Sequence, residues 1–310
     1  MSKTFKIFCA DDLPFLGEVK HLFPNIKIDQ WSGSGGVTAD TYREVFKTYD
    51  GVVTTHTVRI DSQLFDDDYK VKAISTYGTG QDYLDKPFLA SKGIKVIGIH
   101  DEHVYSTSEL TLALALNCIR NISTSNNYVK TGEWSKTGLT LYMGDNLYNK
   151  TWGIAGMGKI GIKLAEMLKP FGCKVIYTAN SDHNNGYEYC TKEELLQRSD
   201  IVSLHMPLKE DTINYIDEAE LKLMKKTAIL VNVARGKVIN NAVLYEYLRN
   251  GQIHSAALDV TDPEPLNDVE IANIPNLLIT PHIGTAAAYT RKEMTRAAVS
   301  NLMSLLEDKA

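Results

Sequence analysis

Short apolar runs alternate with segments of helical periodicity along most of the chain. In parallel α/β proteins each strand is followed by a helix, so this alternation predicts that architecture. In the first part of the chain, up to His100, the predicted strands are FKIFCA, DGVVTT, VKAISTY and IKVIGI. A second series follows Lys150 and comprises TWGIAG, KVIYTA, IVSLHM, AILVNVA, HSAALDV and NLLITPHI.

Helical periodicity fills most of the spaces between these strands. Residues 104–134, VYSTSELTLALALNCIRNISTSNNYVKTGEW, carry Ser and Thr near their start and predict one long helix. Two further helices are predicted for KIGIKLAEMLKPFG and NAVLYEYLRNG, and a last one for AAAYTRKEMTRAAVSNLMSLLEDKA at the end of the sequence. No internal repeat is evident.

Composition narrows the class of protein. The 310 residues, of which 44% are hydrophobic, suffice for the cores of two modest domains. A net charge of -5 without a Lys/Arg block argues against a nucleic-acid partner. No apolar run approaches the length of a membrane span, and MSKTFKIFCADD predicts a strand rather than a signal peptide. We therefore expect a soluble protein with no membrane partner.

The cysteines indicate the compartment. They are scattered without a CxxC pair, which predicts reduced thiols in a cytoplasmic protein rather than a disulfide framework. No metal site is expected. The four residues are Cys9, Cys118, Cys173 and Cys190.

A glycine-rich turn follows the strand TWGIAG. Gly156, Gly158 and Gly161 form a G-x-G-x-x-G array between a strand and a helix. The first glycine permits a tight turn, the second lets a pyrophosphate approach the backbone, and the third lets helix and strand pack closely. Backbone N–H groups near Lys159 and Ile160 would then face the diphosphate at a helix N-terminus. The turn predicts a dinucleotide site; the alternative is a glycine turn without a ligand.

Three polar residues follow separate strands of the second series. Arg235 lies in VNVARG, Glu264 in LDVTDPEPL and His282 in TPHIG, and the carboxyl ends of parallel strands share one edge of a sheet. His can exchange the hydroxyl proton of a 2-hydroxy acid, a carboxylate beside it favours the imidazolium, and Arg can bind the substrate carboxylate. Taken singly, Arg235 could be a surface ion-pair partner and Glu264 part of a rigid exposed turn.

Five ordered motifs carry a resemblance to a known family. They are GMGKIG, SDIVSLHMPLKEDT, NVARGKVI, ALDVTDPEPL and PHIGTAA, and together the chain resembles the D-isomer-specific 2-hydroxyacid dehydrogenases over nearly its whole length. The resemblance implies that His282 is the acid/base, Glu264 its partner and Arg235 the substrate anchor. It also implies a homodimer with residues 128–149 as an arm.

The resemblance further implies a discontinuous two-domain α/β layout. A Rossmann dinucleotide-binding domain, residues 102–283, would be inserted in a flavodoxin-like substrate domain built from residues 1–101 and 284–310. Backbone N–H groups of Tyr77, Gly78 and Thr79 would bind the substrate carboxylate, and Asp259 would hold the nicotinamide carboxamide. The other expected cofactor-binding residues are Ser108, Gly156, Met157, Gly158, Lys159, Ile160, Gly161, Ala179, Asn180, Ser181, His205, Pro207, Thr212, Val233, Ala234, His282 and Gly284.

The strand KVIYTA ends without the acidic residue that usually binds the adenosine ribose of NAD. Aligned on the family pattern, the position of the acid falls at about Ala179, followed by Asn180 and Ser181. A missing carboxylate removes the repulsion of a 2′-phosphate, and Asn180, Ser181 and His183 could bind it. We expect the cofactor to be NADP or NAD, with a modest preference for NADP; a loop that lies clear of the ribose is the alternative.

The function expected is an NAD(P)-dependent oxidoreductase that interconverts a small 2-oxo acid and the D-2-hydroxy acid by hydride transfer. Glyoxylate, hydroxypyruvate, pyruvate and branched 2-oxo acids remain open as substrates. Two alternatives are an NAD(H)-sensing regulatory protein on the same fold and a phosphite dehydrogenase-like enzyme. The formate-oxidising branch of the family carries Gln at the position of Glu264, which argues against it.

Overall fold

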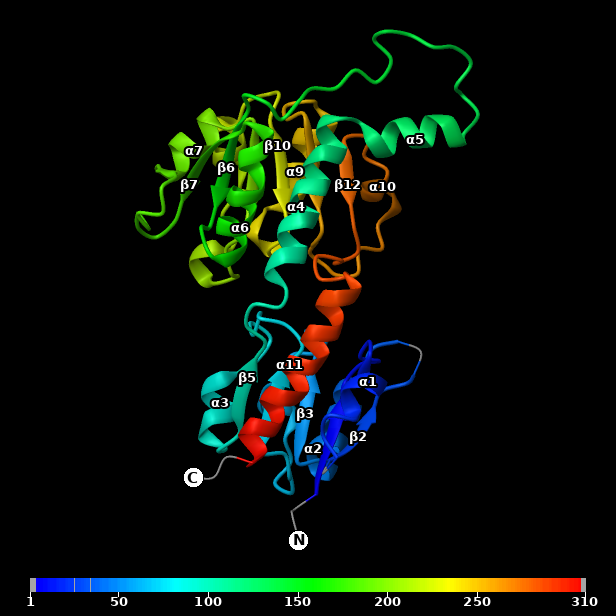
Figure 1. Ribbon diagram of the computed structural model, residues 1–310, viewed down its shortest axis with the longest axis vertical. Coiled ribbons are helices and arrows are strands. Elements are labelled where there is room, and N and C mark those ends of the chain that lie inside the picture. The colour runs from blue at the N-terminus through cyan, green and yellow to red at the C-terminus, as the bar shows by residue number, and fades with distance from the viewer. Residues whose placement is uncertain (1–3, 25, 34, 308–310) are drawn as a thin grey trace. The chain divides into compact units, whose positions relative to one another are not determined.

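The chain forms two compact units, each built on its own parallel sheet (Figure 1). The computed structural model describes residues 4–24, 26–33 and 35–307. Within them the chain divides after His103 and again after Thr285, whereas the sequence-based boundaries were placed after residues 101 and 283. Residues 1–3 and 308–310, which the sequence-based domains include, lie outside the described residues. Helices cover both sheets, which confirms the expected α/β class.

The N-terminal unit has a five-stranded sheet in the order β2-β1-β3-β4-β5, and all its strand pairs are parallel. This is the flavodoxin-like order. One core cluster lies under α1 and α11, and the other lies under α2 and α3 (Figure 1). The elements are β1 (Phe5–Cys9), α1 (Leu16–Lys20), β2 (Ile26–Gln30), α2 (Ala39–Thr48), β3 (Gly51–Thr54), η1 (Ser62–Leu64), β4 (Ala73–Thr76), α3 (Lys86–Ser91), β5 (Lys95–Gly98) and α11 (Ala288–Glu307).

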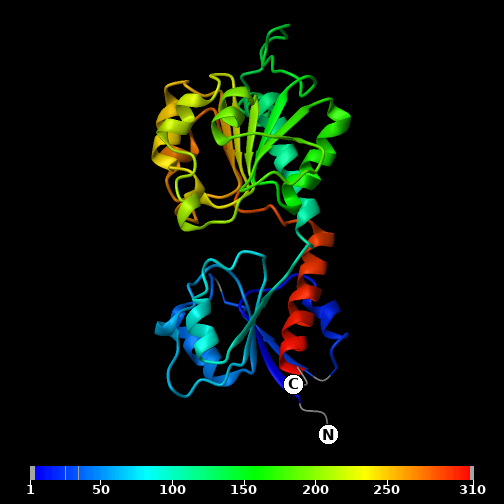
Figure 2. The ribbon, with the colours of Figure 1, turned by 90° about the vertical axis from the view of Figure 1, so that its left-hand side faces the viewer.

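The central unit has a seven-stranded sheet in the order β12-β11-β10-β9-β6-β7-β8, again with parallel pairs. The order reverses between β6 and β9, and open α/β sheets bind ligands at such a switch point. Figure 2 shows helices on both sides of this sheet. The strands are β6 (Thr151–Ala155), β7 (Lys174–Thr178), β8 (Glu188–Tyr189), β9 (Ile201–Leu204), β10 (Ile229–Asn232), β11 (Ser255–Leu258) and β12 (Leu277–Ile279).

Two apolar clusters fill the central unit, one on each face of its sheet. One receives side chains from α7, α8 and α9, and the other from α4 and α6. The helices are α4 (Val104–Ile119), α5 (Ile122–Lys130), α6 (Lys159–Leu168), α7 (Lys192–Arg198), α8 (Glu218–Leu223), α9 (Asn241–Arg249) and α10 (Val269–Ala272), with 3-10 turns at η2 (Lys169–Phe171), η3 (Glu210–Thr212) and η4 (Gly236–Val238).

The prediction of one long helix over residues 104–134 is wrong, because the chain breaks between α4 and α5. Asn121 adopts a left-handed conformation with φ of 53°, which asparagine tolerates better than most residues. The Asn117 side chain accepts the Ser123 N–H at 2.7 Å and so satisfies one donor at the start of α5. Asp145 N–H in turn donates to the Ile119 carbonyl at 3.0 Å. A side-chain bond from Ser123 to Asn117 and a backbone bond from Asp145 therefore replace helix continuation here.

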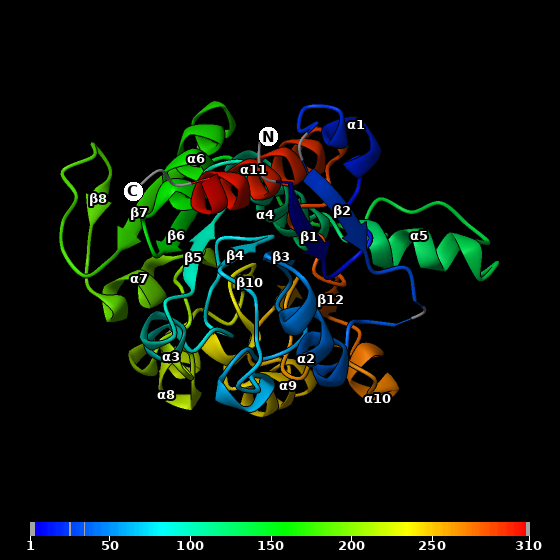
Figure 3. The ribbon, with the colours of Figure 1, turned by 90° about the horizontal axis from the view of Figure 1, so that it is seen from below.

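Helix α5 buries no residue, and the chain that follows it is largely exposed. Figures 1 and 3 show α5 and this segment extending away from the sheet of the central unit. None of the described helices combines the length and the apolarity that a membrane crossing requires.

Candidate active site

The glycine turn between β6 and α6 has the geometry expected for a tight turn, for the approach of a pyrophosphate and for close packing of helix and strand. Gly156 has a φ of 98°, and a Cβ there would lie 2.9 Å from the backbone of His205. A Cβ on Gly161 would lie 2.6 Å from the Gly156 carbonyl oxygen, so close packing of helix and strand requires glycine. Gly158, the N-cap of α6, would place its Cβ in open space with no atom within 4 Å. That open side is where a pyrophosphate would approach the helix N-terminus.

Ser108 and Thr212, which were also expected to bind the cofactor, form hydrogen bonds within the protein through their hydroxyl groups. The buried Ser108 hydroxyl donates to the carbonyls of Val104 and Ile160, and so ties α4 to the start of α6 beside the glycine turn. Thr212 donates to the Pro207 carbonyl at 2.8 Å and closes the loop after β9. Both residues support the walls of the expected site.

His205 follows β9 and packs under the glycine turn. Its Nε2 lies 2.9 Å from the Ser203 hydroxyl, which also accepts the Trp152 indole N–H at 2.9 Å. The residue is partly exposed, but its ring Nδ1 is buried. Burial lowers the pKa of His205 to about 3, so the ring is neutral at physiological pH.

The loop after β7 carries the residues expected near the adenosine ribose. Ala179 is half-buried, while Asn180 and Ser181 are exposed. The Ala179 carbonyl accepts a long hydrogen bond, 3.4 Å, from the Tyr189 hydroxyl of β8.

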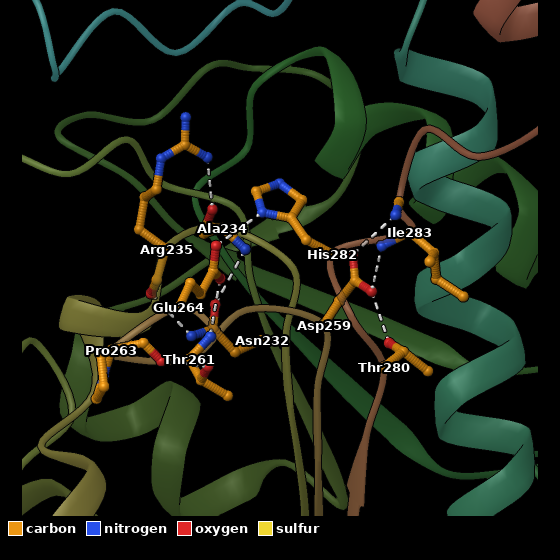
Figure 4. Close-up of polar contacts among 11 residues, drawn as sticks. Asn232, Ala234, Arg235, Asp259, Thr261, Pro263, Glu264, Thr280, His282 and Ile283 are labelled. Atoms are coloured by element: carbon orange, nitrogen blue, oxygen red, sulfur yellow. Dashed lines mark hydrogen bonds and ion pairs between the residues drawn. The ribbon is translucent and has the colours of Figure 1, made fainter. Parts of the chain in front are cut away.

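Arg235, Glu264 and His282 follow adjacent strands of the central sheet. Arg235 comes after β10, Glu264 lies in the loop after β11, and His282 comes after β12. Because β10, β11 and β12 are neighbours, their carboxyl ends meet at one edge, and Figure 4 shows Glu264 between the other two side chains. The expected gathering of these residues is thus present in the fold.

His282 and Glu264 form a direct pair. His282 Nδ1 lies 3.0 Å from Glu264 Oε2, and the other carboxylate oxygen accepts the Thr261 N–H at 2.9 Å (Figure 4). The Thr261 hydroxyl donates to the Pro263 carbonyl at 2.8 Å, which fixes the loop that carries Glu264. The side chains of His282 and Glu264 are 33% and 28% exposed, so both can be reached by a small molecule.

Asp259 anchors the segment that carries His282. Its carboxylate accepts the Thr280 hydroxyl at 2.6 Å and the N–H groups of Ile283 and Gly284 at 2.9 and 2.8 Å. Burial raises the pKa of the Asp259 carboxyl, although these three hydrogen bonds lower it. This buried clamp holds His282 in a left-handed conformation with φ of 53°. The contact of Asp259 with the nicotinamide stays a prediction.

Arg235 is held at its backbone by the buried Asn232. The Asn232 amide donates to the Arg235 carbonyl at 2.9 Å and accepts the Ala234 N–H at 3.0 Å. One guanidinium nitrogen donates to the Ala234 carbonyl at 2.8 Å. Val233, next to Ala234, is half-buried at the end of β10. The Arg235 side chain is therefore directed away from the strand end, as Figure 4 shows.

The loop expected to bind the substrate carboxylate lies after β4 in the N-terminal unit. Tyr77 N–H donates to the Thr54 carbonyl at 2.8 Å, so it is unavailable to a ligand, which corrects that part of the prediction. Within the described residues, the N–H groups of Gly78 and Thr79 donate no hydrogen bond to the protein. The Thr76 hydroxyl holds this loop by donating to the Gly78 carbonyl at 2.6 Å.

The sequence did not identify the residues that position the three side chains. Their common feature is a hydrogen bond to the backbone or carboxylate of a site residue; they are Asn232, Thr261 and Thr280. Asn232 is the first residue of NVARG and Thr280 directly precedes PHIG, so their place in or next to these motifs is the signal that could have found them.

A dinucleotide-binding sheet whose carboxyl edge carries a His–Glu pair and an arginine has the groups that a hydride-transferring dehydrogenase needs. The comparisons agree. The family model described as "D-isomer specific 2-hydroxyacid dehydrogenase, NAD binding domain" matches residues 112–284. A glyoxylate reductase of Pyrococcus horikoshii is 33% identical over 96% of this chain and 92% of its own length.

Solved structures of nicotinamide-dependent enzymes share the fold of this chain. An acyclic imino acid reductase in complex with NADPH and D-Arg superposes with a TM-score of 0.87 at 25% identity, covering 98% of each chain. The D-lactate dehydrogenase of Aquifex aeolicus, complexed with NAD and lactic acid, has a TM-score of 0.83 at 25% identity and covers 98% of this chain and 96% of its own.

The chain belongs to the D-isomer-specific 2-hydroxyacid dehydrogenase family. It is an oxidoreductase that interconverts a small 2-oxo acid and a D-2-hydroxy acid with NAD or NADP.

Proposed function

We propose that the protein reduces glyoxylate and related small 2-oxo acids, with His282 as the acid/base, Glu264 as its partner and Arg235 as the substrate anchor. The 3.0 Å contact between His282 Nδ1 and Glu264 Oε2 carries this assignment. A carboxylate only accepts hydrogen bonds, so Nδ1 carries the proton in this pair. Nε2 is then the ring nitrogen that exchanges a proton with the substrate.

The reaction requires a proton and a hydride. When bound, the nicotinamide donates hydride to the carbonyl carbon or accepts it from the carbinol carbon. In reduction, His282 gives its Nε2 proton to the carbonyl oxygen, which becomes the hydroxyl; in oxidation it takes that proton back. Glu264 stabilises the imidazolium that precedes reduction and follows oxidation.

Arg235 binds the negative end of the substrate. A guanidinium can donate two parallel hydrogen bonds to a carboxylate, which fixes the orientation of the 2-oxo acid. For the N-terminal unit, we propose that the N–H groups of Gly78 and Thr79 bind a carboxylate. The glyoxylate reductase relative supports a small substrate.

The cofactor is proposed to be NADP in preference to NAD, by a modest margin. Ala179 stands where NAD-specific dinucleotide sites carry an acid, so nothing at that position repels a 2′-phosphate. Asn180 and Ser181 are exposed beside it and can donate neutral hydrogen bonds. The imino acid reductase of similar fold, which binds NADPH, supports this choice.

The protein is also proposed to be a cytoplasmic homodimer. The reduced cysteines support the cytoplasm, since all four are free thiols in the structure. Exposed apolar side chains on α5 and in the segment after it support the dimer, because such patches mark association surfaces.

The test is initial-rate reduction of a 2-oxo acid panel, followed by the absorbance of reduced nicotinamide, with NADPH and NADH in parallel. We expect glyoxylate to be reduced, with kcat/KM higher for NADPH than for NADH. Failure with every small 2-oxo acid, despite tight cofactor binding, would contradict the proposal and favour a dinucleotide sensor. Oxidation of phosphite without reduction of any 2-oxo acid would contradict it as well.

A further inference from the structure

The loop after β7 contains one carboxylate, Asp182, and the structure holds it inside the loop. Asp182 Oδ1 accepts the Tyr177 hydroxyl at 2.6 Å and the Asn184 N–H at 2.9 Å. The hydrogen bond from Tyr177 is the main cause that lowers the pKa of this carboxyl. Tyr177 also accepts the His183 N–H at 2.7 Å, so one buried phenol fixes two consecutive loop residues. Both hydrogen bonds end on Oδ1, so this oxygen of Asp182 is held within the loop.

The imidazole of His183 bridges this loop to the glycine turn. Its Nδ1 lies 3.1 Å from the carbonyl oxygen of Met157, the residue between Gly156 and Gly158. A carbonyl only accepts, so Nδ1 carries the hydrogen in either charge state. The other nitrogen, Nε2, is then an acceptor when the ring is neutral and a donor when the ring is protonated.

The position of this ring matches the place of the adenosine ribose. In dinucleotide-binding units the pyrophosphate sits on the glycine turn, and the ribose hydroxyls are bound at the end of the second strand, here β7. His183 touches both elements, through Met157 on the turn and through Tyr177 on β7. Its side chain is exposed, so a ligand can reach it.

We propose that His183 takes the place of the missing carboxylate and makes the choice of cofactor depend on pH. The neutral ring accepts a hydrogen bond from the ribose 2′-hydroxyl of NAD, and the protonated ring donates to the 2′-phosphate of NADP. This inference deepens the proposed function and rests on it, since it concerns the same dinucleotide site.

The charged groups around the ring permit such a change. Asp182 precedes it in the loop, and the neutral phenol of Tyr177 lies beside it with ring centroids 5.9 Å apart. The glycine turn presents the Met157 carbonyl, and the nearest ionisable residue along that segment is Lys159 at the start of α6. Imidazoles gain their charge between about pH 8 and pH 5, within the range where the enzyme can be assayed.

The experiment is the ratio of kcat/KM for NADPH to kcat/KM for NADH as a function of pH. Effects on the chemical step are common to both cofactors and cancel in this ratio. As pH falls from about 8.5 to about 5.5, we expect the ratio in wild type to rise by about fivefold relative to His183→Gln, the size typical of an exposed charge pair. In His183→Gln the amide still donates and accepts but does not titrate.

Two controls separate the effect of His183 from other sources of pH dependence. The 2′-phosphate itself takes up a proton near pH 6, but this contribution is the same in wild type and variant. His254→Gln changes an exposed histidine at the amino end of β11 and should keep the wild-type pH profile. Identical pH profiles for wild type and His183→Gln would overturn the inference.

Measurements of cofactor binding distinguish a failure of the proposed 2-oxo acid reduction from a failure of this inference. If no 2-oxo acid is reduced, the Kd values of NADPH and NADH, measured by nicotinamide fluorescence over the same pH range, give the same ratio without turnover. A pH-dependent Kd ratio that His183→Gln abolishes would then support the inference while the substrate assignment fails. A Kd ratio unaffected by the substitution would overturn it.

Discussion

At the scale of single residues, the imidazole of His282 is positioned by its neighbours more than by its own preferences. Its backbone lies in the left-handed region, which non-glycine residues seldom adopt, although Asn, Asp and His do so more often than the others. Asp259 holds the segment through Thr280, Ile283 and Gly284, and Glu264 fixes the ring. The strain of the backbone is therefore offset by hydrogen bonds on both sides of the residue.

Two glycines of the same turn should respond differently to one added methyl group. Gly158→Ala places the methyl in open space, so the free energy of unfolding should change by less than about 0.5 kcal/mol. The same methyl lies where the pyrophosphate approaches, so the Kd of NADPH should rise by about tenfold or more.

Gly161→Ala is the matched control for that substitution. Its methyl would meet the Gly156 carbonyl oxygen at 2.6 Å, so unfolding should become easier by about 1–3 kcal/mol. Urea denaturation and fluorescence titration measure the two quantities. Unchanged NADPH affinity in Gly158→Ala would show that the turn does not hold a pyrophosphate.

At the scale of the elements, α5 buries no residue, and Leu147 is the one buried residue of 131–148. Leu139 is fully exposed and Met143 is 72% exposed. Apolar side chains in such a segment gain stability only when another surface covers them.

The homodimer should therefore weaken when charge enters this segment. We expect wild type to sediment as a dimer at micromolar concentration, and Leu139→Asp combined with Met143→Asp to raise the dimer dissociation constant by about tenfold or more. Leu22→Asp, at a leucine 60% exposed in the N-terminal unit, should leave it unchanged. A monomeric wild type, or equal effects of both variants, would contradict the dimer arm.

Some helices and strands could be predicted from the sequence pattern, and others could not. Central strands such as β10 were predictable, because a run of apolar residues buried on both faces leaves a clear signal. In the edge strand β2, Lys27 and Asp29 interrupt the apolar run, and β8 has only two residues; neither strand was predicted. The break at Asn121 depends on bonds from Asn117 and Asp145, which helical periodicity does not reveal.

At the scale of the whole molecule, the α/β class followed from the alternation of strands and helices, and the family resemblance supplied the discontinuous layout. Arg235, Glu264 and His282 could be grouped from the sequence because each follows a strand, and parallel strands end at one edge. The hydrogen bonds of the Asp259 carboxylate and of the Tyr77 N–H could not be predicted, since their partners lie far along the chain. Long-range polar contacts were the part that the sequence left undetermined.

The proposed exchange of a proton between His282 and the substrate can be tested with His282→Asn. Asparagine tolerates the left-handed backbone and can still donate to Glu264, so the segment should keep its conformation. We expect kcat for glyoxylate reduction to fall by about a hundredfold or more, with the Kd of NADPH nearly unchanged. Undiminished turnover in this variant would contradict the claim.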